Sequence, residues 1–461
     1  MELPIFGISG LRGIVGKDLS PERVAAVAAL FGEFLGPGAV ALGQDSRPTS
    51  PMLAGAAIAG LKEAGREVVE LGVCPTPTVL HYVRRHGLAG GLVITASHNP
   101  AEWNGVKFVS SRGAFLFGSE FQRFKRLVEA AVPSRFPPSA FRFPPSAFRF
   151  PHSGAIAEHV GAIVQNELFQ CVRERLAGQG LRVGIDAVNG AASVAAIELI
   201  RAFGVEPVPL FCEPGKAELG FPRGPEPIPD NLAELCRLVR NDGLAAGFAF
   251  DPDGDRFSCV DETGTPLGEE ATVCLACRHV LARRRGPVVV NLSTSRAVDD
   301  ICQEFGVKVE RTAVGEARVV ERMLELGAVV GGEGNGGAIV PSINLGRDGL
   351  VAAAVILAKI SEMPLSQARL SLPVYHMVKS RVELNREEFS PRVERLVKTF
   401  TGAQFDRTDG LRIDGNDFWI HIRPSNTEPI VRIIVEAKTR AQAEGLAQEV
   451  RGALEADGGK R

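Results

Sequence analysis

The chain has 461 residues, of which 45% are hydrophobic and 23% are charged, as in ordinary globular proteins. It carries 52 lysines and arginines against 54 aspartates and glutamates, for a net charge of -2. This balance argues against a general nucleic-acid binder, which carries a basic excess. A chain of this length divides into about two to four domains.

The sequence shows neither a signal peptide nor a membrane span. Its first residues, MELPIFGISG, have no basic region before an apolar run, and no apolar run approaches the roughly 20 residues that cross a bilayer. The cysteines are scattered and lie mostly in apolar segments, which is typical of reduced thiols in a cytoplasmic protein. Cys274 and Cys277 lie in a helical pattern, so we expect them in the core and not at a zinc site. We expect no nucleic-acid and no membrane partner.

Helix-like and strand-like segments alternate through most of the chain. The first helices are predicted at 22–36 and 52–65, and the first strands at 39–46, 67–73 and 90–97. A strand, glycine turn, helix and strand follow at 181–210, and the same pattern returns at 286–312. Alternation of this kind is typical of doubly wound, mostly parallel sheets covered by helices. We therefore predict an α/β fold with three similar doubly wound domains.

The C-terminal region has a different pattern. Residues 409–457 contain two short alternating strands, a polar turn between them and a closing amphipathic helix. This indicates a small α+β domain with an antiparallel sheet. The expected boundaries are 1–134 for domain I, 155–250 for domain II, 251–368 for domain III and 369–461 for domain IV.

A tandem repeat occupies the remaining segment, 135–154. The sequence RFPPSAF occurs at 135–141 and again at 142–148. Its prolines lack backbone donors and favour extended structure. We interpret the repeat as a lengthened linker between the first two domains, in preference to a recognition tag for a partner.

The first polar motif is Thr95-Ala96-Ser97-His98-Asn99-Pro100, directly after an apolar strand. A serine at the carboxyl end of a strand lies where open α/β sheets bind ligands, and a neighbouring histidine can exchange protons near neutral pH. The same residues also make a good turn. The motif alone therefore leaves a catalytic and a structural role open.

The second motif is Asp251-Pro252-Asp253-Gly254-Asp255-Arg256, after the apolar strand GLAAGFAF. Asp251, Asp253 and Asp255 alternate in a tight loop, which suits a hard divalent cation. An EF-hand is the nearest rival, but the downstream glutamate is misplaced and no helix precedes the loop. We therefore predict a metal site here.

Two further loops offer groups for a sugar phosphate. Gly331–Gly337 is rich in glycine and carries Glu333 and Asn335, whose oxygens and amide suit sugar hydroxyls. Arg423–Pro429 carries Arg423, Ser425, Asn426 and Thr427, a combination that suits phosphate. Each loop alone could be a simple turn.

The cations that could neutralise a phosphate are far apart in sequence. Arg12 lies in the glycine-rich segment 6–13, and Lys107, Arg256 and Arg423 follow at long intervals. If they converge, they supply a local positive site that the near-neutral chain lacks overall.

Together the motifs resemble the α-D-phosphohexomutase superfamily, which includes phosphoglucomutases, phosphomannomutases and phosphoglucosamine mutases. TASHNP followed by Asn104-Gly105-Val106-Lys107 resembles the phosphoserine loop, DPDGDR the magnesium loop, GGEGNGG the sugar loop and RPSNTEP the phosphate loop. The four matches occur in the family's order over essentially the whole chain. The resemblance implies four domains around a central cleft, with one loop from each.

The resemblance also implies a role for each motif. Ser97 carries the phosphoryl group and contributes to the Mg²⁺ site of Asp251, Asp253 and Asp255. Arg12, Lys107 and Arg256 belong to the catalytic site, where Arg12 and Lys107 stabilise the migrating group and His98 or Lys107 moves the proton. Glu333 and Asn335 bind sugar hydroxyls. The non-reacting phosphate is held by the phosphate loop, through Arg423, Ser425, Asn426 and Thr427.

By the same resemblance, the reaction interconverts hexose 1-phosphate and hexose 6-phosphate through a bound 1,6-bisphosphate, with hexose 1,6-bisphosphate as activator. GEGNGG is similar to the loop of archaeal-type members and leaves glucose, mannose and glucosamine open, including glucosamine as the sole sugar. Two other functions also stay open, a phosphoserine-dependent phosphatase and a catalytically silent sugar-phosphate-binding protein. The expected state is a monomer or homodimer.

Overall fold

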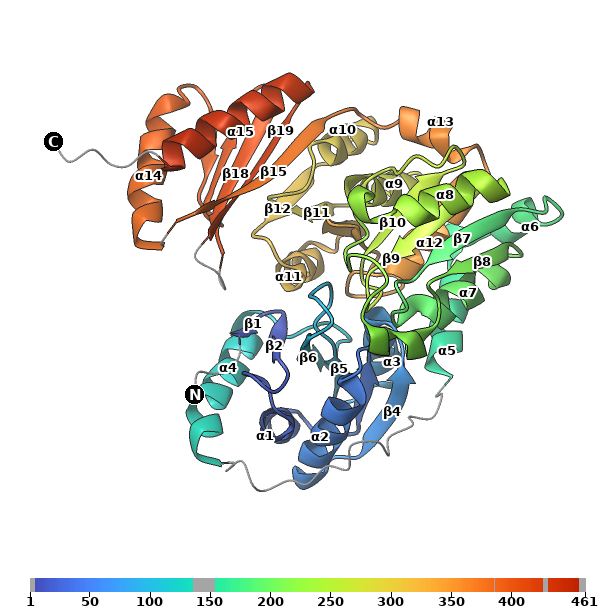
Figure 1. The fold of residues 1–461 in the computed structure, drawn as a ribbon, viewed down its shortest axis with the longest axis vertical. Coiled ribbons are helices and arrows are strands. Elements are labelled where there is room, and N and C mark those ends of the chain that lie inside the picture. The colour runs from blue at the N-terminus through green and yellow to red at the C-terminus, as the bar shows by residue number, and fades with distance from the viewer. Residues whose placement is uncertain (1–4, 136–153, 385, 426–429, 456–461) are drawn as a thin grey trace.

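The structure, a computed structural model, describes residues 5–135, 154–384, 386–425 and 430–455. Its strands form four separate sheets that follow one another along the chain. Domain I lies at the bottom of Figure 1, domains II and III fill the centre and right, and domain IV lies at the upper left. The predicted organisation into three α/β domains and a C-terminal α+β domain is confirmed.

Domain I has a mixed sheet in the order β1-β2-β6-β5-β3-β4. Only β3, β4 and β5 run parallel, and the other pairs are antiparallel. Its elements are β1 (Ile5–Gly7), β2 (Gly10–Ile14), α1 (Pro21–Phe34), β3 (Val40–Gln44), α2 (Ser50–Glu63), β4 (Val68–Val73), α3 (Thr76–His86), β5 (Gly90–Ile94), β6 (Trp103–Ser110) and α4 (Gly118–Arg135). Helix α1 begins at Pro21, one residue before the predicted start, because Ser20 caps it by accepting a hydrogen bond from the Arg23 amide.

Domain II has the sheet order β10-β9-β7-β8. Its elements are α5 (Ala155–Val164), α6 (Val172–Leu176), β7 (Arg182–Asp186), α7 (Ala192–Ala202), β8 (Glu206–Leu210), α8 (Ala233–Asp242), β9 (Ala246–Phe250) and β10 (Phe257–Asp261). Strands β9 and β10 pair antiparallel across the 251–256 loop. The boundary that we expected at 250/251 would cut this pair, so the loop belongs to domain II and does not begin domain III.

Domain III has the sheet order β12-β11-β13-β14, again parallel with one antiparallel edge strand. Its elements are α9 (Glu269–Leu281), β11 (Val288–Asn291), α10 (Ala297–Glu304), β12 (Val309–Thr312), α11 (Glu316–Leu326), β13 (Val330–Glu333), β14 (Gly337–Ile339), α12 (Gly349–Ile360) and α13 (Leu365–Leu370). Helix α12 is apolar almost all round because it is almost entirely buried. Asp348 caps it by accepting hydrogen bonds from the Leu350 and Val351 amides.

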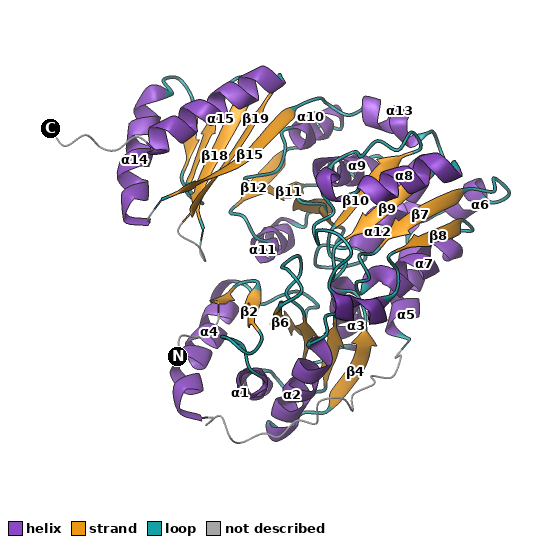
Figure 2. Cartoon of the chain, viewed as in Figure 1, coloured by secondary structure: helices purple, strands orange, loops and turns teal. Residues whose placement is uncertain are grey.

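Domain IV is an antiparallel sheet, β15-β19-β18-β17-β16, with two helices on one face (Figure 2). Its elements are β15 (His376–Glu383), α14 (Arg386–Thr399), β16 (Gln404–Asp406), β17 (Leu411–Asp414), β18 (Phe418–Pro424), β19 (Ile430–Ala437) and α15 (Arg440–Glu455). The sequence pattern predicted β18, β19 and α15. It did not identify β15, β16 and α14, whose alternation of buried and exposed residues is weaker.

The domains are not equally independent. One hydrophobic cluster extends through parts of domains I, II and III, whereas domain IV packs around a cluster of its own. Cys274 and Cys277 belong to the shared cluster, which confirms their predicted place in the core. No helix among the described residues is long and apolar enough to cross a membrane. The proline repeat at 135–148 lies outside the described residues, apart from Arg135.

Candidate active site

The 251–256 loop is the junction of the first three domains. Its backbone carbonyls accept hydrogen bonds from Thr76 of domain I (2.8 Å), Ala191 of domain II (2.8 Å) and Gly349 of domain III (3.2 Å). Gly254 has a φ of +70°, which favours glycine and lets the loop turn tightly. The loop is therefore held rigidly from three sides.

Ser97 lies beside this loop and is 1% exposed. Its Oγ donates to Asp251 Oδ2 at 3.3 Å and lies 3.4 Å from His98 Nδ1. Its backbone has a φ of +52°, in the left-handed region that a serine rarely adopts. The strand-to-loop turn thus points the hydroxyl at the aspartates.

A buried arginine that the motif search did not single out fixes this turn. Arg47 donates to the carbonyls of Ser97 (2.6 Å), Asn99 (2.8 Å) and Pro100 (2.6 Å). Its Nε pairs with Asp45 at 2.9 Å. A guanidinium has its donors in a rigid fork, so it holds these three carbonyls of the turn in one geometry.

The three aspartates fit a divalent cation. Asp251, Asp253 and Asp255 each offer a carboxylate oxygen, and these atoms lie within 4.8 Å of one another. Asp253 Oδ1 and Asp255 Oδ1 are buried and accept no hydrogen bond in the described structure. Burial, together with the charges of Asp255 and Asp253, raises the pKa of Asp251 well above its usual range. A cation bound here would relieve both the repulsion and the missing partners.

Lys107 and Arg347 supply part of the missing positive charge. Lys107 Nζ lies 2.6 Å from Asp253 Oδ2 and 3.1 Å from Asp255 Oδ2. Burial disfavours a charged carboxylate at Asp255, but Arg347, Lys107 and Arg256 outweigh it and hold its pKa far below the usual range. Burial likewise opposes the charge on Lys107, yet Asp253 and Asp255 raise the pKa of its ammonium group.

His98 is held as a neutral imidazole. Arg256 Nη2 donates to its Nδ1 at 2.8 Å, so the ring proton is on Nε2. Burial first, and then the charges of Arg256 and Arg12, lower the pKa of His98 well below its usual value. Arg256 also pairs with Glu226 at 2.6 Å. Nothing in the sequence singled out Glu226 beyond its place in a proline-rich loop.

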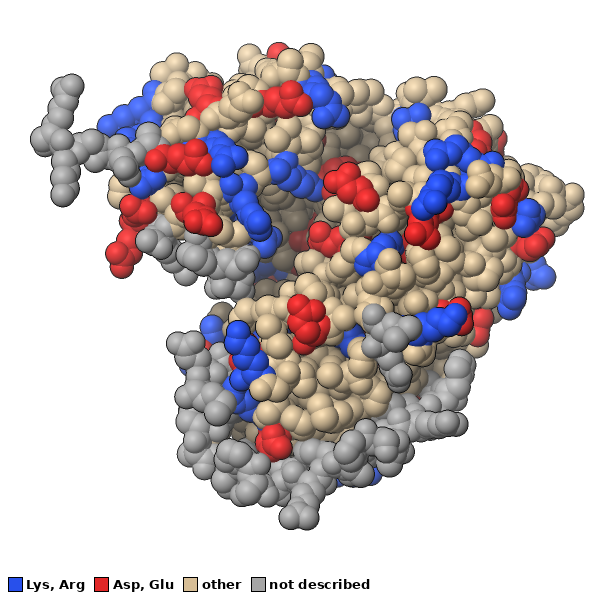
Figure 3. Space-filling model, in the orientation of Figure 1, with Lys and Arg blue, Asp and Glu red and all other residues tan. Residues whose placement is uncertain are grey.

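A cleft of about 990 Å³ opens next to these groups and is lined by all four domains. Arg12, His98 and Lys107 come from domain I, Arg256 from domain II, Glu333 and Asn335 from domain III, and Arg423 from domain IV. Basic side chains lie along the side of domain IV that borders the hollow (Figure 3). The predicted convergence of distant cations is thus seen in the structure. Ser425 is described, whereas Asn426 and Thr427 lie outside the described residues.

Arg347 joins the Gly331–Gly337 loop to the 251–256 loop. Its guanidinium lies 2.8 Å from Glu333 Oε2 and 2.7 Å from Asp255 Oδ2, and its Nε lies 3.2 Å from Glu316 Oε2. Glu333 also accepts from Asn291 Nδ2 (2.7 Å). Neither Arg347 nor Glu316 was predicted from the sequence. The only local signal was the turn Gly346–Gly349 before an apolar helix.

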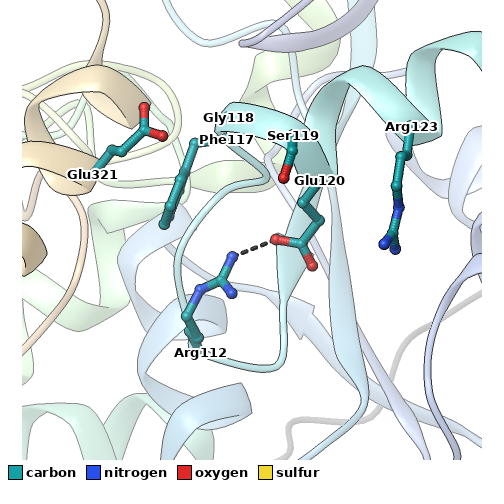
Figure 4. A pocket seen from close by; sticks show the side chains of 7 residues that line it. All are labelled: Arg112, Phe117, Gly118, Ser119, Glu120, Arg123 and Glu321. Atoms are coloured by element: carbon teal, nitrogen blue, oxygen red, sulfur yellow. Dashed lines mark hydrogen bonds and ion pairs between the residues drawn. The ribbon is translucent and has the colours of Figure 1, made fainter.

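A second, smaller hollow of about 310 Å³ lies between domains I and III (Figure 4). Arg112 pairs with Glu120 at the start of α4, and its guanidinium lies over the Phe117 ring at 4.6 Å. Glu321 of α11 faces this helix end from domain III. None of the sequence motifs contributes to this hollow, which is a contact between the two domains.

Comparison with known proteins agrees with this geometry. Models of the phosphoglucomutase/phosphomannomutase family match along the chain: α/β/α domain I at 3–132, domain II at 157–264, domain III at 269–375 and the C-terminal domain at 377–453. A probable phosphoglucosamine mutase from Methanopyrus kandleri is 36% identical over 451 residues, covering 96% of both chains. A phosphoglucomutase/phosphomannomutase from Thermococcus kodakarensis is 33% identical, covering 95% of this chain and 96% of its own.

Among solved structures, a phosphoglucomutase/phosphomannomutase family protein from Burkholderia thailandensis superposes with a TM-score of 0.80 at 27% identity, covering 98% of each chain. The chain belongs to the phosphoglucomutase/phosphomannomutase family, within the α-D-phosphohexomutase superfamily. It is a phosphohexomutase, an isomerase that acts on sugar phosphates.

Proposed function

We propose that the enzyme interconverts hexose 1-phosphate and hexose 6-phosphate through a phosphoserine at Ser97. The observation that carries this proposal is the placement of the buried Ser97 hydroxyl 3.3 Å from Asp251, at the edge of a cleft lined by all four domains. A phosphatase or a silent binder would not need a second set of phosphate-binding cations on the far side of the cleft.

In the proposed reaction, the P–O bond to Ser97 Oγ breaks as the phosphorus bonds to the free hydroxyl oxygen of the bound sugar monophosphate. The hydroxyl proton goes to a base, and the product is a bound 1,6-bisphosphate. The bisphosphate then reorients within the cleft, and its other phosphoryl group is transferred to Ser97. A dissociated hexose 1,6-bisphosphate would act as an activator by phosphorylating Ser97 again. Such transfers depend on positioning and charge neutralisation more than on covalent protein chemistry.

Asp251, Asp253, Asp255 and the phosphorylated Ser97 would hold Mg²⁺. The ion would neutralise charge on the transferring phosphoryl group. Lys107 already spans two of the aspartates, and Arg12 lines the same part of the cleft, so both are placed to bind the migrating group. Glu333 and Asn335 would bind sugar hydroxyls, and Arg423 with Ser425, Asn426 and Thr427 would hold the phosphate that does not react.

Of the two candidates for moving the proton, we favour His98. Lys107 Nζ is engaged by two carboxylates and stays charged, which makes it a poor base. His98 is neutral, and its Nδ1 lies 3.4 Å from Ser97 Oγ. Nδ1 would be free to accept a proton once Arg256, which donates to it here, turns to a bound phosphate. A His98→Gln variant should lose more of kcat than of substrate affinity, whereas an equal effect on both would assign His98 to binding.

The experiment that tests the function is ³¹P NMR of the enzyme with glucose, mannose and glucosamine 1-phosphates, with Mg²⁺ and a trace of hexose 1,6-bisphosphate. Formation of a 6-phosphate establishes the mutase, and the fastest substrate identifies the sugar. Release of inorganic phosphate would indicate a phosphatase, and no change in any of the three would favour the silent binder. EDTA should abolish turnover and added Mg²⁺ should restore it, while indifference to EDTA would remove the metal role from the three aspartates.

A further inference from the structure

The glutamates that line the cleft differ in how well their charge is neutralised. Glu226 lies 2.6 Å from an arginine, Glu333 2.8 Å and Glu316 3.2 Å, and Glu269 lies 2.9 Å from Lys379. The exception is Glu270, whose nearest cation is Lys379, with Nζ at 3.9 Å from Oε1. That separation is beyond hydrogen-bond distance.

The Glu270 carboxylate lies directly against the sugar loop. It stands in the first turn of α9, and a Cβ placed on Gly334 would come within 2.1 Å and 2.2 Å of its two oxygens. Gly334 must therefore be a glycine for this carboxylate to fit beside Glu333 and Asn335. Oε2 accepts from the Ser295 amide at 3.0 Å, while Oε1 accepts no hydrogen bond from the described residues.

Without a close cation, Glu270 keeps its proton up to a higher pH than usual. Burial raises the pKa of Glu270 to about 8, and Lys379 only partly opposes the effect. The side chain is nevertheless 22% exposed and lines the cleft, so a bound molecule can reach it. A ligand that brings a positive charge favours the ionised carboxylate and gains a charge-assisted hydrogen bond to it.

We propose that Glu270 is a specificity-determining residue that binds the ammonium group of an amino-sugar phosphate. The proposal rests on the proposed function, because it places the sugar at the Gly331–Gly337 loop. An ammonium group donates a charge-assisted hydrogen bond to Oε1 and neutralises the carboxylate. The hydroxyl of a neutral hexose at the same place makes a weaker hydrogen bond and does not stabilise the ionised carboxylate.

The test compares kcat/KM for glucosamine 1-phosphate and glucose 1-phosphate in the wild type, Glu270→Gln and Glu304→Gln. Glutamine keeps the size and the acceptor oxygen but removes the charge. The expected result is a fall of about 10-fold or more in the glucosamine-to-glucose ratio for Glu270→Gln, the size of one charge-assisted hydrogen bond. Glu304→Gln is the matched control, because Glu304 of the same domain pairs with Arg278 and does not line the cleft. Its ratio should stay near that of the wild type.

Three results would overturn the proposal while leaving the mutase intact. They are a wild type that prefers glucose 1-phosphate, equal losses on both sugars in Glu270→Gln, and an equal shift of the ratio in both variants. Absence of turnover with every sugar phosphate would refute the proposed function instead. In that case, calorimetry of glucosamine 6-phosphate and glucose 6-phosphate binding tests the role of Glu270. A selective loss of glucosamine 6-phosphate binding in Glu270→Gln supports that role, and an equal loss for both sugars contradicts it.

Discussion

The two ends of the cleft are built in different ways. At the end formed by domains I to III, Ser97, Lys107 and the three aspartates are at most 3% exposed and are hydrogen-bonded to one another around the 251–256 loop. At the domain IV end the cations are more open, with side-chain exposures of 16% for Arg423 and 46% for Lys379. Domain IV also has its own hydrophobic cluster, separate from the one that joins the other domains.

This difference matches two demands of the proposed reaction. Phosphoryl transfer requires groups fixed in advance, because reorganisation during the step would raise the barrier. Admitting a substrate and turning a bisphosphate require room on the opposite side. The contacts that join domain IV to domain III are polar, as in the hydrogen bonds from Arg296 to the Asn416 and Gly415 carbonyls and from Ser293 Oγ to His421.

The largest effect is expected from Ser97→Ala, at the end of the cleft formed by domains I to III. Loss of the group that carries the phosphoryl should lower turnover by at least about three orders of magnitude. The fold should remain intact, because the hydroxyl makes one long hydrogen bond, at 3.3 Å. ³¹P NMR measures turnover and circular dichroism checks the fold, with Ser119→Ala, exposed on the same domain, as control. Near-normal turnover would exclude Ser97 as the phosphoryl carrier.

Arg347→Met tests whether the rigid network at the end of the cleft formed by domains I to III includes the Gly331–Gly337 loop. The variant leaves Glu333, Glu316 and Asp255 without their shared cation, so we expect a loss of stability of about 3–5 kcal/mol. It should also weaken Mg²⁺ binding and raise KM. The double variant Arg347→Met, Glu316→Gln should melt at a higher temperature than Arg347→Met alone, because it has one uncompensated carboxylate fewer. Strictly additive effects of the two changes would contradict the shared network.

A smaller effect is expected from the pH dependence of stability at Glu270. Its folded pKa is about 8 against a usual value of 4.5, so between these values the folded state keeps a proton that the unfolded state has lost. Stability should therefore fall as pH rises through this window. Glu270→Gln lacks this decline, so its melting temperature relative to the wild type should rise by a few degrees from pH 5 to pH 8. Calorimetry at the two pH values measures it, and a constant difference would contradict the raised pKa.

The smallest effect is expected outside the cleft. Deletion of residues 142–148 removes one copy of the RFPPSAF repeat and no described contact. If the repeat is a linker, kcat and KM should change by less than about twofold. A large loss of activity or of soluble protein would show that the repeat has a role in the fold. Steady-state kinetics and gel filtration distinguish these results.

Local sequence determined much of this protein. The 3.6-residue and two-residue periodicities predicted α1, α2, β3, β4 and β5 of domain I, because adjacent side chains decide whether a segment can bury one face. Four polar loops predicted Ser97, the three aspartates, Glu333 and Arg423, because turn chemistry and ligand chemistry both show in short stretches. The prediction of domain IV was less complete, because β15 and β16 have a weaker pattern of alternating residues.

Only the tertiary structure decided how these loops meet. The 251–256 loop joins β9 to β10, which pair antiparallel in one sheet. The loop residues do not reveal this pairing, because it depends on which strand becomes the partner of β9. Arg347 lies between Glu333 and Asp255, which are 14 and 92 residues away, and its role depends on which strand ends come together. The lack of a close cation at Glu270 follows from the same cause, since ion pairs between distant residues are set by packing and have no local pattern in the sequence.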